Sequence, residues 1–385
     1  MTWLMDERGF ITRFKYDIAT EGMTQRIDDV DTAQTSDEPA GWETPTGGGL
    51  HLITDFTNDV QGRTIETLGP IHTIDLSGTA TSIRRASWNV YQDAAFENWA
   101  GQGYQKTSDS SYTLINPVQI AKMDAAGKVL EQISSTRGSS TTSSGKLAAT
   151  DTFAQSSYVR WQTTQYTDCC FAASQRAYKL IPTSGAGTSG TNYDETDFGY
   201  DVMKRRNRTV SPGGTITRTV FNSRGLATGI WVGTNDNGAS ATDPSGGGAA
   251  GNNMVQVSGV EYDSNVAGGD SNVTKQIAYV DSNSANNRET SFVYDFRNRR
   301  TATDGEIDFY EQVIYDNLDR VLRTDRRNTT SAGNLIARAE TRFDDRGRVY
   351  QSVRYGVDPT SGVVGYGLTD NTWFDASGNV IKSQP

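Results

Sequence analysis

The sequence predicts an all-β fold made of an array of β-hairpins. Composition supports this prediction, because 39 of the 385 residues are Gly and only 35% are hydrophobic. Such a composition is typical of many short strands joined by polar turns. The 17 Tyr, 13 Phe and 7 Trp residues supply apolar bulk for folding, which argues against disorder. No segment has helical periodicity over a convincing length, and Asp93–Trp99 is the only short helical candidate.

A short motif recurs along the chain and is the strongest evidence for repeated hairpins. An aromatic residue is followed by Asp, two variable residues and a residue that favours turns. The clearest copies are Tyr294-Asp295, Tyr315-Asp316, Phe343-Asp344 with Gly347, and Phe374-Asp375 with Gly378. Weaker copies begin at Met5, Tyr16, Asn58, Met123, Tyr200, Phe221 and Tyr262. Tyr294 and Tyr315 are 21 residues apart (315 minus 294), which is the length of a supersecondary module.

Each residue of the motif has a physical role in a hairpin. Asp is favoured at the first position of a type I turn, where its carboxylate accepts backbone N–H groups. Gly at the fourth position adopts the left-handed conformation that closes the hairpin. Asn298 and Asp319 stand at this place and also tolerate that conformation, whereas Lys204 tolerates it less well. The aromatic residue ends the incoming strand, and the residue after the turn begins the return strand.

The motif is clear in residues 200–385 and degenerate in residues 1–199, where loop insertions are long. We therefore expect two regions of one continuous repeat architecture. A lone hairpin buries too little surface to be stable, so neighbouring hairpins must pair edge to edge. Turn-rich tracts between the motifs predict loops. These tracts are Asp31–Gly49, Ser134–Thr150, Thr183–Thr196, Thr234–Asn253 and Asp281–Asn287.

The net charge and the hydrophobicity pattern argue against binding to nucleic acid or anionic membranes and against membrane insertion. The formal net charge of −10 repels phosphate groups, so neither nucleic acid nor an anionic membrane surface is expected to bind. The first residues, MTWLMDERGF, lack a basic segment followed by an apolar one, so no signal peptide is visible in them. No apolar run approaches the roughly 18 residues of a membrane span, so we expect no membrane insertion.

The only two cysteines, Cys169 and Cys170, are adjacent. A vicinal disulfide is strained, and the spacing fits neither a disulfide framework nor a zinc site. Two packed thiols in a strand are the favoured interpretation. A surface redox pair is the alternative, and the role of these cysteines stays open.

The sequence predicts no catalytic, cofactor-binding or metal site. Residues 185–190 and 246–251 match GxGxxG, but neither stretch is followed by a helical pattern, so both are expected to be loops. His51 and His72 stand in strand-like stretches without a nucleophile motif nearby. Most carboxylates that could form a hydrolase pair already have a turn role, and the polar residues near Asp263 do not have the spacing of a calcium loop.

Four aromatic residues outside the motif raise the question of a sugar-binding surface. They are Trp88, Tyr91, Trp99 and Tyr104. Such rings could stack on sugars, but packing on one face of a strand is the favoured interpretation.

The motif Tyr-Asp-x-x-Gly-Arg at spacings near 21 residues resembles the YD repeat of the Rhs family. The resemblance is carried by YDFRNRR from Tyr294, YDNLDRV from Tyr315, FDDRGRV from Phe343 and FDASGNV from Phe374. That family includes bacterial rearrangement-hotspot proteins, the C components of insecticidal toxin complexes, and teneurins. The resemblance implies a curved or spiralling sheet of hairpins, which forms part of a shell. In the family such a shell encloses a toxin, or supports adhesion and carbohydrate binding at the cell surface.

The chain departs from the complete family pattern in two ways. It lacks the C-terminal core motif resembling Asp-Pro-x-Gly-Leu, whose aspartates release an enclosed toxin. The stretch from Asp358 to Gly362 is close to it but lacks the following Leu, so proteolysis is not transferred to this chain. The chain also begins and ends inside repeats, and we therefore expect a segment of a larger protein.

These observations predict a non-enzymatic structural segment without cofactors, whose partners are the rest of a larger Rhs-like chain or an enclosed toxin domain. By the resemblance, its location is expected to be secreted or at the cell surface. The first alternative is a scaffold that binds carbohydrate or protein through its exposed strands and loops. The second is a hydrolase with an unrecognised acidic cleft.

Overall fold

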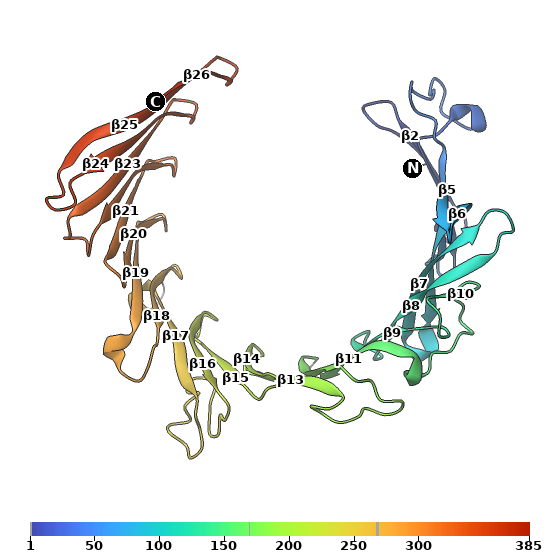
Figure 1. The fold of residues 1–385 in the computed structure, drawn as a ribbon, viewed down its shortest axis with the longest axis horizontal. Helices are drawn as coiled ribbons and strands as arrows, with labels where there is room; N and C mark the ends of the chain where they lie inside the picture. The colour runs from blue at the N-terminus through green and yellow to red at the C-terminus, as the bar shows by residue number, and fades with distance from the viewer. Residues whose placement is uncertain (1, 169, 267–268) are drawn as a thin grey trace. The chain divides into compact units, whose positions relative to one another are not determined.

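The computed structural model describes residues 2–168, 170–266 and 269–385. This part of the chain is all-β, as predicted, with strands joined by turns and a few short 3₁₀ segments. It divides into two compact units, residues 1–197 and residues 198–385. Within each unit the strands pair antiparallel with their neighbours in sequence, and Figure 1 shows them side by side in chain order.

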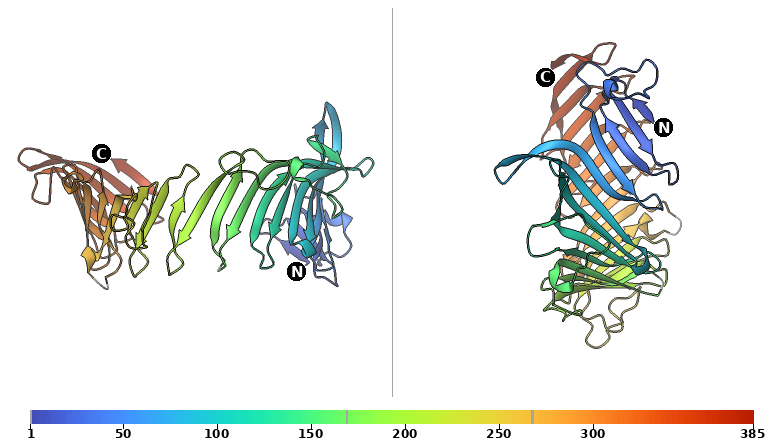
Figure 2. Two further views of the ribbon diagram at one scale, coloured as in Figure 1. Left: turned by 90° about the horizontal axis from the view of Figure 1, so that it is seen from below. Right: turned by 90° about the vertical axis from the view of Figure 1, so that its right-hand side faces the viewer.

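The strands that begin in the first unit are β1 (Trp3–Met5), β2 (Ile11–Tyr16), β3 (Met23–Asp28), β4 (Leu52–Asn58), β5 (Thr64–Leu76), β6 (Thr79–Gln92), β7 (Glu97–Lys106), β8 (Tyr112–Met123), β9 (Val129–Ser135), β10 (Thr142–Ser144), β11 (Tyr158–Tyr166), β12 (Ala172–Tyr178) and β13 (Tyr193–Tyr200). Strand β10 departs from the chain order, because it pairs with one end of β8 while β9 pairs with the other end. The β5–β6 hairpin is the longest in this unit and extends beyond the neighbouring strands (Figure 2).

The strands of the second unit are β14 (Arg206–Val210), β15 (Ile216–Phe221), β16 (Ala227–Gly233), β17 (Val255–Tyr262), β18 (Val273–Ala278), β19 (Arg288–Tyr294), β20 (Arg300–Gly305), β21 (Phe309–Tyr315), β22 (Val321–Arg327), β23 (Leu335–Phe343), β24 (Val349–Val357), β25 (Val364–Phe374) and β26 (Val380–Gln384). The 3₁₀ segments of the two units are Thr32–Gln34, Asp93–Ala95, Gln155–Ser157, Asp263–Asn265 and Ser284–Asn286.

Among the described residues, the clusters of buried hydrophobic side chains lie in the first unit. Trp88, Trp99 and Trp161 lie on one face of the sheet with Leu114 and Ile133, and all five are buried. The connection between β9 and β11 folds over this face and contributes Leu147 and Phe153. The Trp99 and Phe153 rings meet edge to face at 5.3 Å. The favoured interpretation of Trp88 and Trp99 as packed residues is therefore confirmed.

The second unit is a single sheet layer in which few side chains are buried. Its buried hydrophobic residues, within the described ranges, are Ile216, Met254, Ala302, Leu335 and Val353. The most buried acidic side chain is Asp325, and Arg338 binds it with two hydrogen bonds of 2.7 Å. A sheet of this kind cannot depend on a core for its stability, so polar contacts between neighbouring hairpins must hold it together.

The helix predicted over Asp93–Trp99 is wrong. Only Asp93–Ala95 forms a 3₁₀ turn, Phe96 follows in the left-handed conformation, and Glu97 begins β7 opposite Gln92. The segment is a hairpin turn, because so short a stretch cannot form a stable helix without tertiary support.

Two of the predicted loops, Ser134–Thr150 and Thr183–Thr196, include residues that form strands. Ser134 and Ser135 complete β9, Thr142–Ser144 forms β10, and Tyr193–Thr196 belongs to β13. Ladder hydrogen bonds to neighbouring strands override the turn composition of these segments.

The prediction that Cys170 and His51 lie in strands is also wrong. Cys170 is exposed and lies in the turn between β11 and β12 with φ of 84°, rather than in a strand. Cys169 falls outside the described residues. His51 precedes β4 with φ of 50°, and its Nδ1 accepts the backbone N–H of Asp31 at 3.1 Å. His51 therefore has a structural role in a loop, while His72 lies in β5 as expected.

Asp236 joins the long loop after β16 to the sheet of the second unit, and this contact predicts a pH dependence. Its carboxylate accepts 2.6 Å hydrogen bonds from Nε of Arg208 and Nε of Arg218. The bond from Arg208, opposed by partial burial and supported by Arg218, lowers the pKa of Asp236 to about 2. Because the folded-state pKa lies below the ordinary value of 3.8, the stabilisation is complete above that value and is lost as the pH falls toward 2.

We expect Asp236→Asn to lower the free energy of unfolding of this unit by about 1–3 kcal/mol at pH 7, because two partly buried guanidinium groups lose a charged acceptor. The difference between variant and parent should shrink at pH 2, where the parent carboxylate is about half protonated in the folded state and almost fully protonated in the unfolded state. Urea unfolding at both pH values measures it. An equal difference at both pH values would contradict this assignment.

Candidate functional site: the turn spine

The predicted motif residues of the second unit lie at hairpin turns along one edge of its sheet. Three successive hairpins each contribute an Asp and an Arg, and the following hairpin contributes an aromatic ring. We call this set the turn spine. Its members are Asp295, Arg299 and Tyr315, then Asp316, Arg320 and Phe343, then Asp344, Arg348 and Phe374.

Each Asp organises its own turn. Oδ1 of Asp295 accepts the backbone N–H groups of Arg297 and Arg299 at 2.9 and 3.1 Å. Oδ2 accepts Nε–H of Arg299 at 2.8 Å. The hydrogen bond from the Arg299 side chain lowers the pKa of Asp295, with burial acting in the opposite direction. A charged acceptor bound by several donors fixes the turn more strongly than a neutral one.

The other motif aspartates bind in the same way. Asp316 accepts from Leu318 and Arg320, Asp344 from Arg346 and Arg348, and Asp375 from both the backbone and side-chain nitrogens of Asn379.

The fourth turn position takes the left-handed conformation that the sequence predicted. Gly347 and Gly378 have φ of 81° and 94°. Asn298 and Asp319 adopt φ of 61° and 63°, and Lys204 adopts 64° despite its long side chain. Backbone bonds around Lys204 match those of the glycine turns, since its N–H reaches the carbonyl of Asp201 at 2.9 Å. The turn therefore accommodates Lys204, although Lys has a low preference for the left-handed conformation.

The arginine after each turn joins two neighbouring hairpins. The Arg299 guanidinium lies 4.8 Å from the ring centroid of Tyr315, which ends the next incoming strand. It also donates to the backbone carbonyl of Asp316 at 2.7 Å. Arg320 and Arg348 lie over Phe343 and Phe374, each at 4.5 Å. A planar guanidinium can bind a carboxylate in its plane and an aromatic ring on its face at the same time.

Tyr at the aromatic position adds a second connection. The Tyr315 hydroxyl donates to the carbonyl of Arg300 on the preceding hairpin at 3.1 Å. Tyr262 and Tyr166 make the same bond, to the carbonyls of Ala227 and Val129, each at 3.1 Å. Phe343 and Phe374 lack the hydroxyl and keep only the ring contact. Tyr and Phe are thus interchangeable for stacking, but only Tyr supplies this hydrogen bond.

A β-bulge recurs beside the aromatic position. In ten of the described hairpins, the pairing register shifts next to the residue that ends the incoming strand. These residues are Tyr16, Asn58, Met123, Tyr166, Phe221, Tyr262, Tyr294, Tyr315, Phe343 and Phe374. A bulge bends its strand and increases local twist, so this recurring irregularity is a source of curvature within each unit.

Sequence reasoning placed the motif residues at turns but missed the contacts between hairpins. The available signal was an Arg four residues after Asp295, Asp316 and Asp344, which was interpreted only as the start of a strand. Arg63 over Tyr91 and Arg205 over Phe221 repeat the arrangement outside the clearest copies, at 4.1 and 4.7 Å.

Hairpins with the same turn but without the motif were also missed, and one of them contains Cys170. Between β11 and β12, Thr167 stands in place of the motif Asp and Cys170 takes the fourth position. The N–H of Cys170 reaches the carbonyl of Thr167 at 2.9 Å, and the N–H of Thr167 reaches the carbonyl of Phe171 at 2.8 Å. The turn geometry explains why Cys170 has a positive φ.

Among the described residues, the other side chains considered as catalytic or metal-binding candidates do not lie together in one site. Within the described residues, no group of three or more His, Cys, Asp and Glu side chains is placed to hold a metal ion. No helix in that part of the chain is long and apolar enough to cross a membrane. Asp263 accepts from Arg224 at 2.8 Å and from the backbone of Ser271 and Asn272, which places it in a turn.

No known family model and no curated protein matches the sequence. Similar solved structures include the crystal structure of TcdB2–TccC3 without its hypervariable C-terminal region, with 13% sequence identity and a TM-score of 0.43, covering 97% of this chain and 17% of that one. The Photorhabdus luminescens Tc holotoxin pore matches at 11% identity with a TM-score of 0.27, covering 100% of this chain and 21% of that one. A porin-like protein from Bacteroides uniformis has 9% identity and a TM-score of 0.16, covering 78% of this chain and 93% of that one. This chain thus spans about a fifth of the length of the toxin-complex chains.

If the turn spine holds the hairpins together, Arg299 should contribute more to the stability of the second unit than an exposed arginine elsewhere on the same sheet. We expect Arg299→Gln to lower the melting temperature of the second unit by about 2–4 °C, a shift typical of losing about one good interaction in a unit of this size. Arg354 is exposed, and its side chain makes no hydrogen bond or ion pair within the described residues, so Arg354→Gln serves as the control and should leave the melting temperature nearly unchanged. Equal shifts for the two variants in thermal unfolding would argue against the spine.

Proposed function

We propose that the chain is a non-enzymatic structural segment, a length of β-sheet wall in a larger YD-repeat protein. The observation that carries this proposal is the turn spine. The residues that recur most often, and that could otherwise do chemistry, bind one another across consecutive hairpins. Asp295 and Asp316 each engage backbone donors and an arginine, so their lone pairs serve the turn instead of a substrate.

The sheet of the second unit also leaves strand surface available for a partner. Strand β26 pairs with β25, and all five of its residues are exposed. Val380 and Ile381 on this strand are 59% and 67% exposed, and Trp373 on β25 is 42% exposed. Within the described residues, β25 is the only strand paired with β26, and a free strand edge flanked by apolar side chains readily accepts another strand. The proposed partner is further chain of the same repeat type, and the wall that they form would enclose or present a toxin domain or a surface module.

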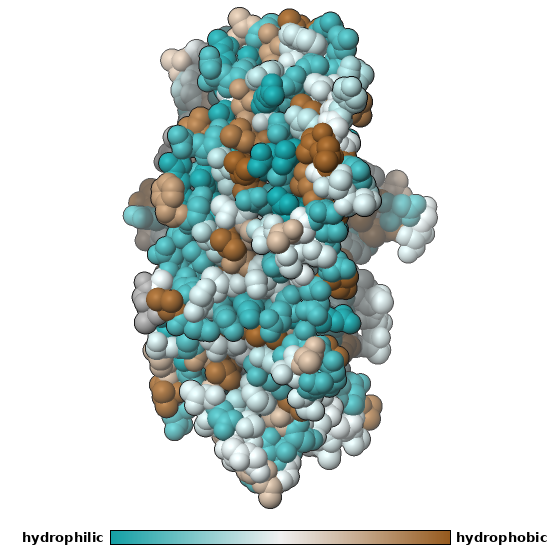
Figure 3. Space-filling view, turned by 90° about the vertical axis from the view of Figure 1, so that its left-hand side faces the viewer, coloured by the Kyte–Doolittle hydropathy of each residue, from teal (hydrophilic) through white to brown (hydrophobic). Residues whose placement is uncertain are grey.

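The polarity of the surface is consistent with a sheet that is exposed to water. Apolar side chains on the face drawn in Figure 3 are scattered among hydrophilic ones. Together with the net charge of −10, such a surface favours solubility over association with anionic partners. By the family resemblance, we propose that the larger protein is secreted or presented at the cell surface.

Extending the sheet tests the proposal. Val380 in β26 corresponds to Val349 in β24, because each follows a motif turn and pairs with the aromatic residue before it. A copy of residues 354–384 grafted after Gln384 therefore continues the repeat in register. Asn379→Arg in the same chain supplies the missing spine arginine for the grafted Phe.

In a repeat array, an added unit that pairs with its neighbour raises stability through the new interface. We expect the extended chain to unfold at a higher urea concentration than the parent, as measured by urea unfolding curves. The same graft with Asn379 unchanged is the matched control and should gain less. A grafted segment that proteases remove while the parent stability stays unchanged would contradict the proposal.

A further inference from the structure

The β5–β6 hairpin ends in an arm, residues 70–81, that has no neighbouring strand on either side. Strand β4 pairs with β5 only as far as Leu68, and β7 pairs with β6 only as far as Ile83. Within the part of the chain that the structure describes, β6 is the only strand that pairs with residues 71–76. The arm is seen projecting past the other strands in Figure 2. Both of its edges are therefore open to solvent.

Contacts at the base and the tip hold the arm in an extended shape. At the base, the Arg84 guanidinium donates to the carbonyls of Gly69 at 2.7 Å and Leu68 at 2.9 Å. At the tip, Ser77 and Gly78 have φ of 54° and 83°, as in the type I′ turn that matches the twist of a hairpin. The arm is thus a preformed pair of strands, and a partner does not have to order it on binding.

The register of the hairpin determines which backbone groups are free. The tip turn is closed by the pair Leu76–Thr79, and the closing pair of a two-residue turn exchanges both backbone hydrogen bonds. Because such pairs alternate along a ladder, the N–H and C=O groups of Thr73 and Asp75 point away from β6. Ser82 lies opposite Thr73, and its carbonyl accepts an N–H from the β7–β8 connection at 3.1 Å, as this alternation requires.

The free edge of β5 lacks the features that normally protect a strand edge. Residues 71–76 read IHTIDL and contain no Lys, no Pro and no bulge, although such features are common at exposed edges. Ile71 is 65% exposed. Asp75 is the only Asp, Glu, Lys or Arg in the arm, whereas the whole chain has a net charge of −10. The arm is therefore the place where two copies of this acidic chain can meet with little repulsion.

Pairing two identical edges antiparallel favours one alignment. When Thr73 lies opposite Asp75 of the second copy, both residues present free backbone groups and exchange hydrogen bonds. Ile74 then faces Ile74 of the second copy on the other side of the strand, and His72 faces Leu76. An alignment that placed the two Asp75 carboxylates opposite each other would be destabilised by like charges.

We propose that the free β5 edge of the arm is a homodimerisation surface, which pairs antiparallel with the same edge of a second copy of this chain. The two arms then form one continuous sheet that is related by a twofold axis. The surface is small, so the association is weak and reversible. It involves neither the turn spine nor the free edge of β26, and it is independent of the proposed wall function.

Sedimentation equilibrium of the full chain at micromolar to submillimolar concentration tests the surface. We expect the weight-average mass to rise with concentration toward twice that of the chain. Thr73→Pro removes an outward N–H without removing a bond to β6, and should weaken dimerisation by at least about tenfold, because the symmetry of the dimer removes the hydrogen bond twice.

Ala80→Pro is the matched control. Ala80 lies opposite Asp75 on β6, so its N–H also points outward, but at the other edge of the arm. This variant should dimerise like the parent. Circular dichroism of both variants checks that the sheet is retained.

Disulfide trapping tests the alignment separately, in a chain that carries Cys169→Ser and Cys170→Ser. With glutathione disulfide as the oxidant, Ile74→Cys should form a covalent dimer, because residues of a pair without backbone hydrogen bonds lie about 4.5 Å apart at their Cα atoms. Thr73→Cys should not, since its side chain projects from the opposite face of the strand.

Four results would overturn the proposal. They are a parent chain that stays monomeric throughout the concentration range, association that survives Thr73→Pro, an equal loss of association in Ala80→Pro, and trapping of Thr73→Cys as readily as Ile74→Cys. Association that survives Thr73→Pro would assign the contact to another edge, such as that of β26.

Discussion

The structure depends on one repeated interaction, in which a guanidinium group binds the carboxylate of its own turn and covers the aromatic ring of the next hairpin. A single-layer sheet has almost no interior, so its hairpins cannot be held together mainly by apolar burial. Arg299 illustrates the alternative, because it contacts Asp295, the carbonyl of Asp316 and the ring of Tyr315 together. The turn therefore does more than reverse the chain, since it also sets the distance to the next hairpin.

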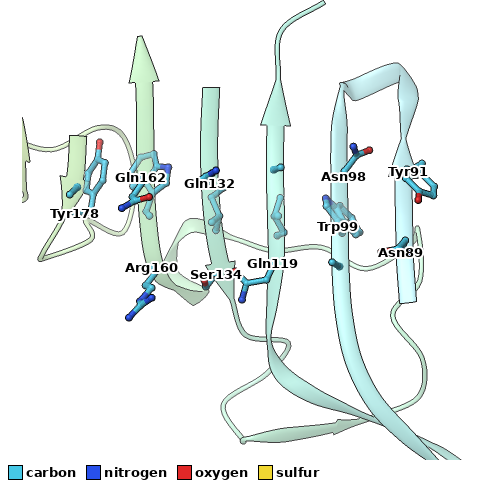
Figure 4. Close-up of a pocket in the computed structure, with 16 residues that line it drawn as sticks. Asn89, Tyr91, Asn98, Trp99, Gln119, Gln132, Ser134, Arg160, Gln162 and Tyr178 are labelled. Atoms are coloured by element: carbon cyan, nitrogen blue, oxygen red, sulfur yellow. Dashed lines mark hydrogen bonds between the residues drawn. The ribbon is translucent and has the colours of Figure 1, made fainter. Parts of the chain in front are cut away.

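The two units are stabilised in different ways. In the first, a long connection folds over one face and buries Trp88, Trp99 and Trp161, whose indole N–H groups donate to Glu66, Glu97 and Glu131. That cover leaves the opposite face of the sheet open, where polar side chains such as Gln132 and Gln162 are exposed (Figure 4). In the second unit, the spine and the buried Asp325–Arg338 pair take the place of a core. Repeats with stronger motifs are thus found where apolar burial is weakest.

The fold class could be predicted from the sequence because the turn residues are local signals. Asp295, Gly347 and Gly378 each act within five residues of themselves, and their conformations follow from elementary turn chemistry. The contact of Arg320 with Phe343 joins residues 23 positions apart (343 minus 320), and only the register of neighbouring strands brings them together. The alignment of Gln119, Ser134 and Arg160 across three strands was missed for the same reason, since these residues lie opposite one another only after the strands pair. The short pattern in Asp93–Trp99 misled because a tight hairpin and the start of a helix share residue preferences.

A double-mutant cycle between Arg320 and Phe343 tests the central claim most directly. Arg320→Gln, Phe343→Leu and the double variant are compared by urea unfolding, with each variant checked for retained β-sheet. If the guanidinium and the ring connect the two hairpins, their coupling energy should be about 0.5–1 kcal/mol, because a cation–π contact near the surface has that strength. Single effects that add within about 0.3 kcal/mol would show that the two residues act independently, and the spine would then be a set of separate turns.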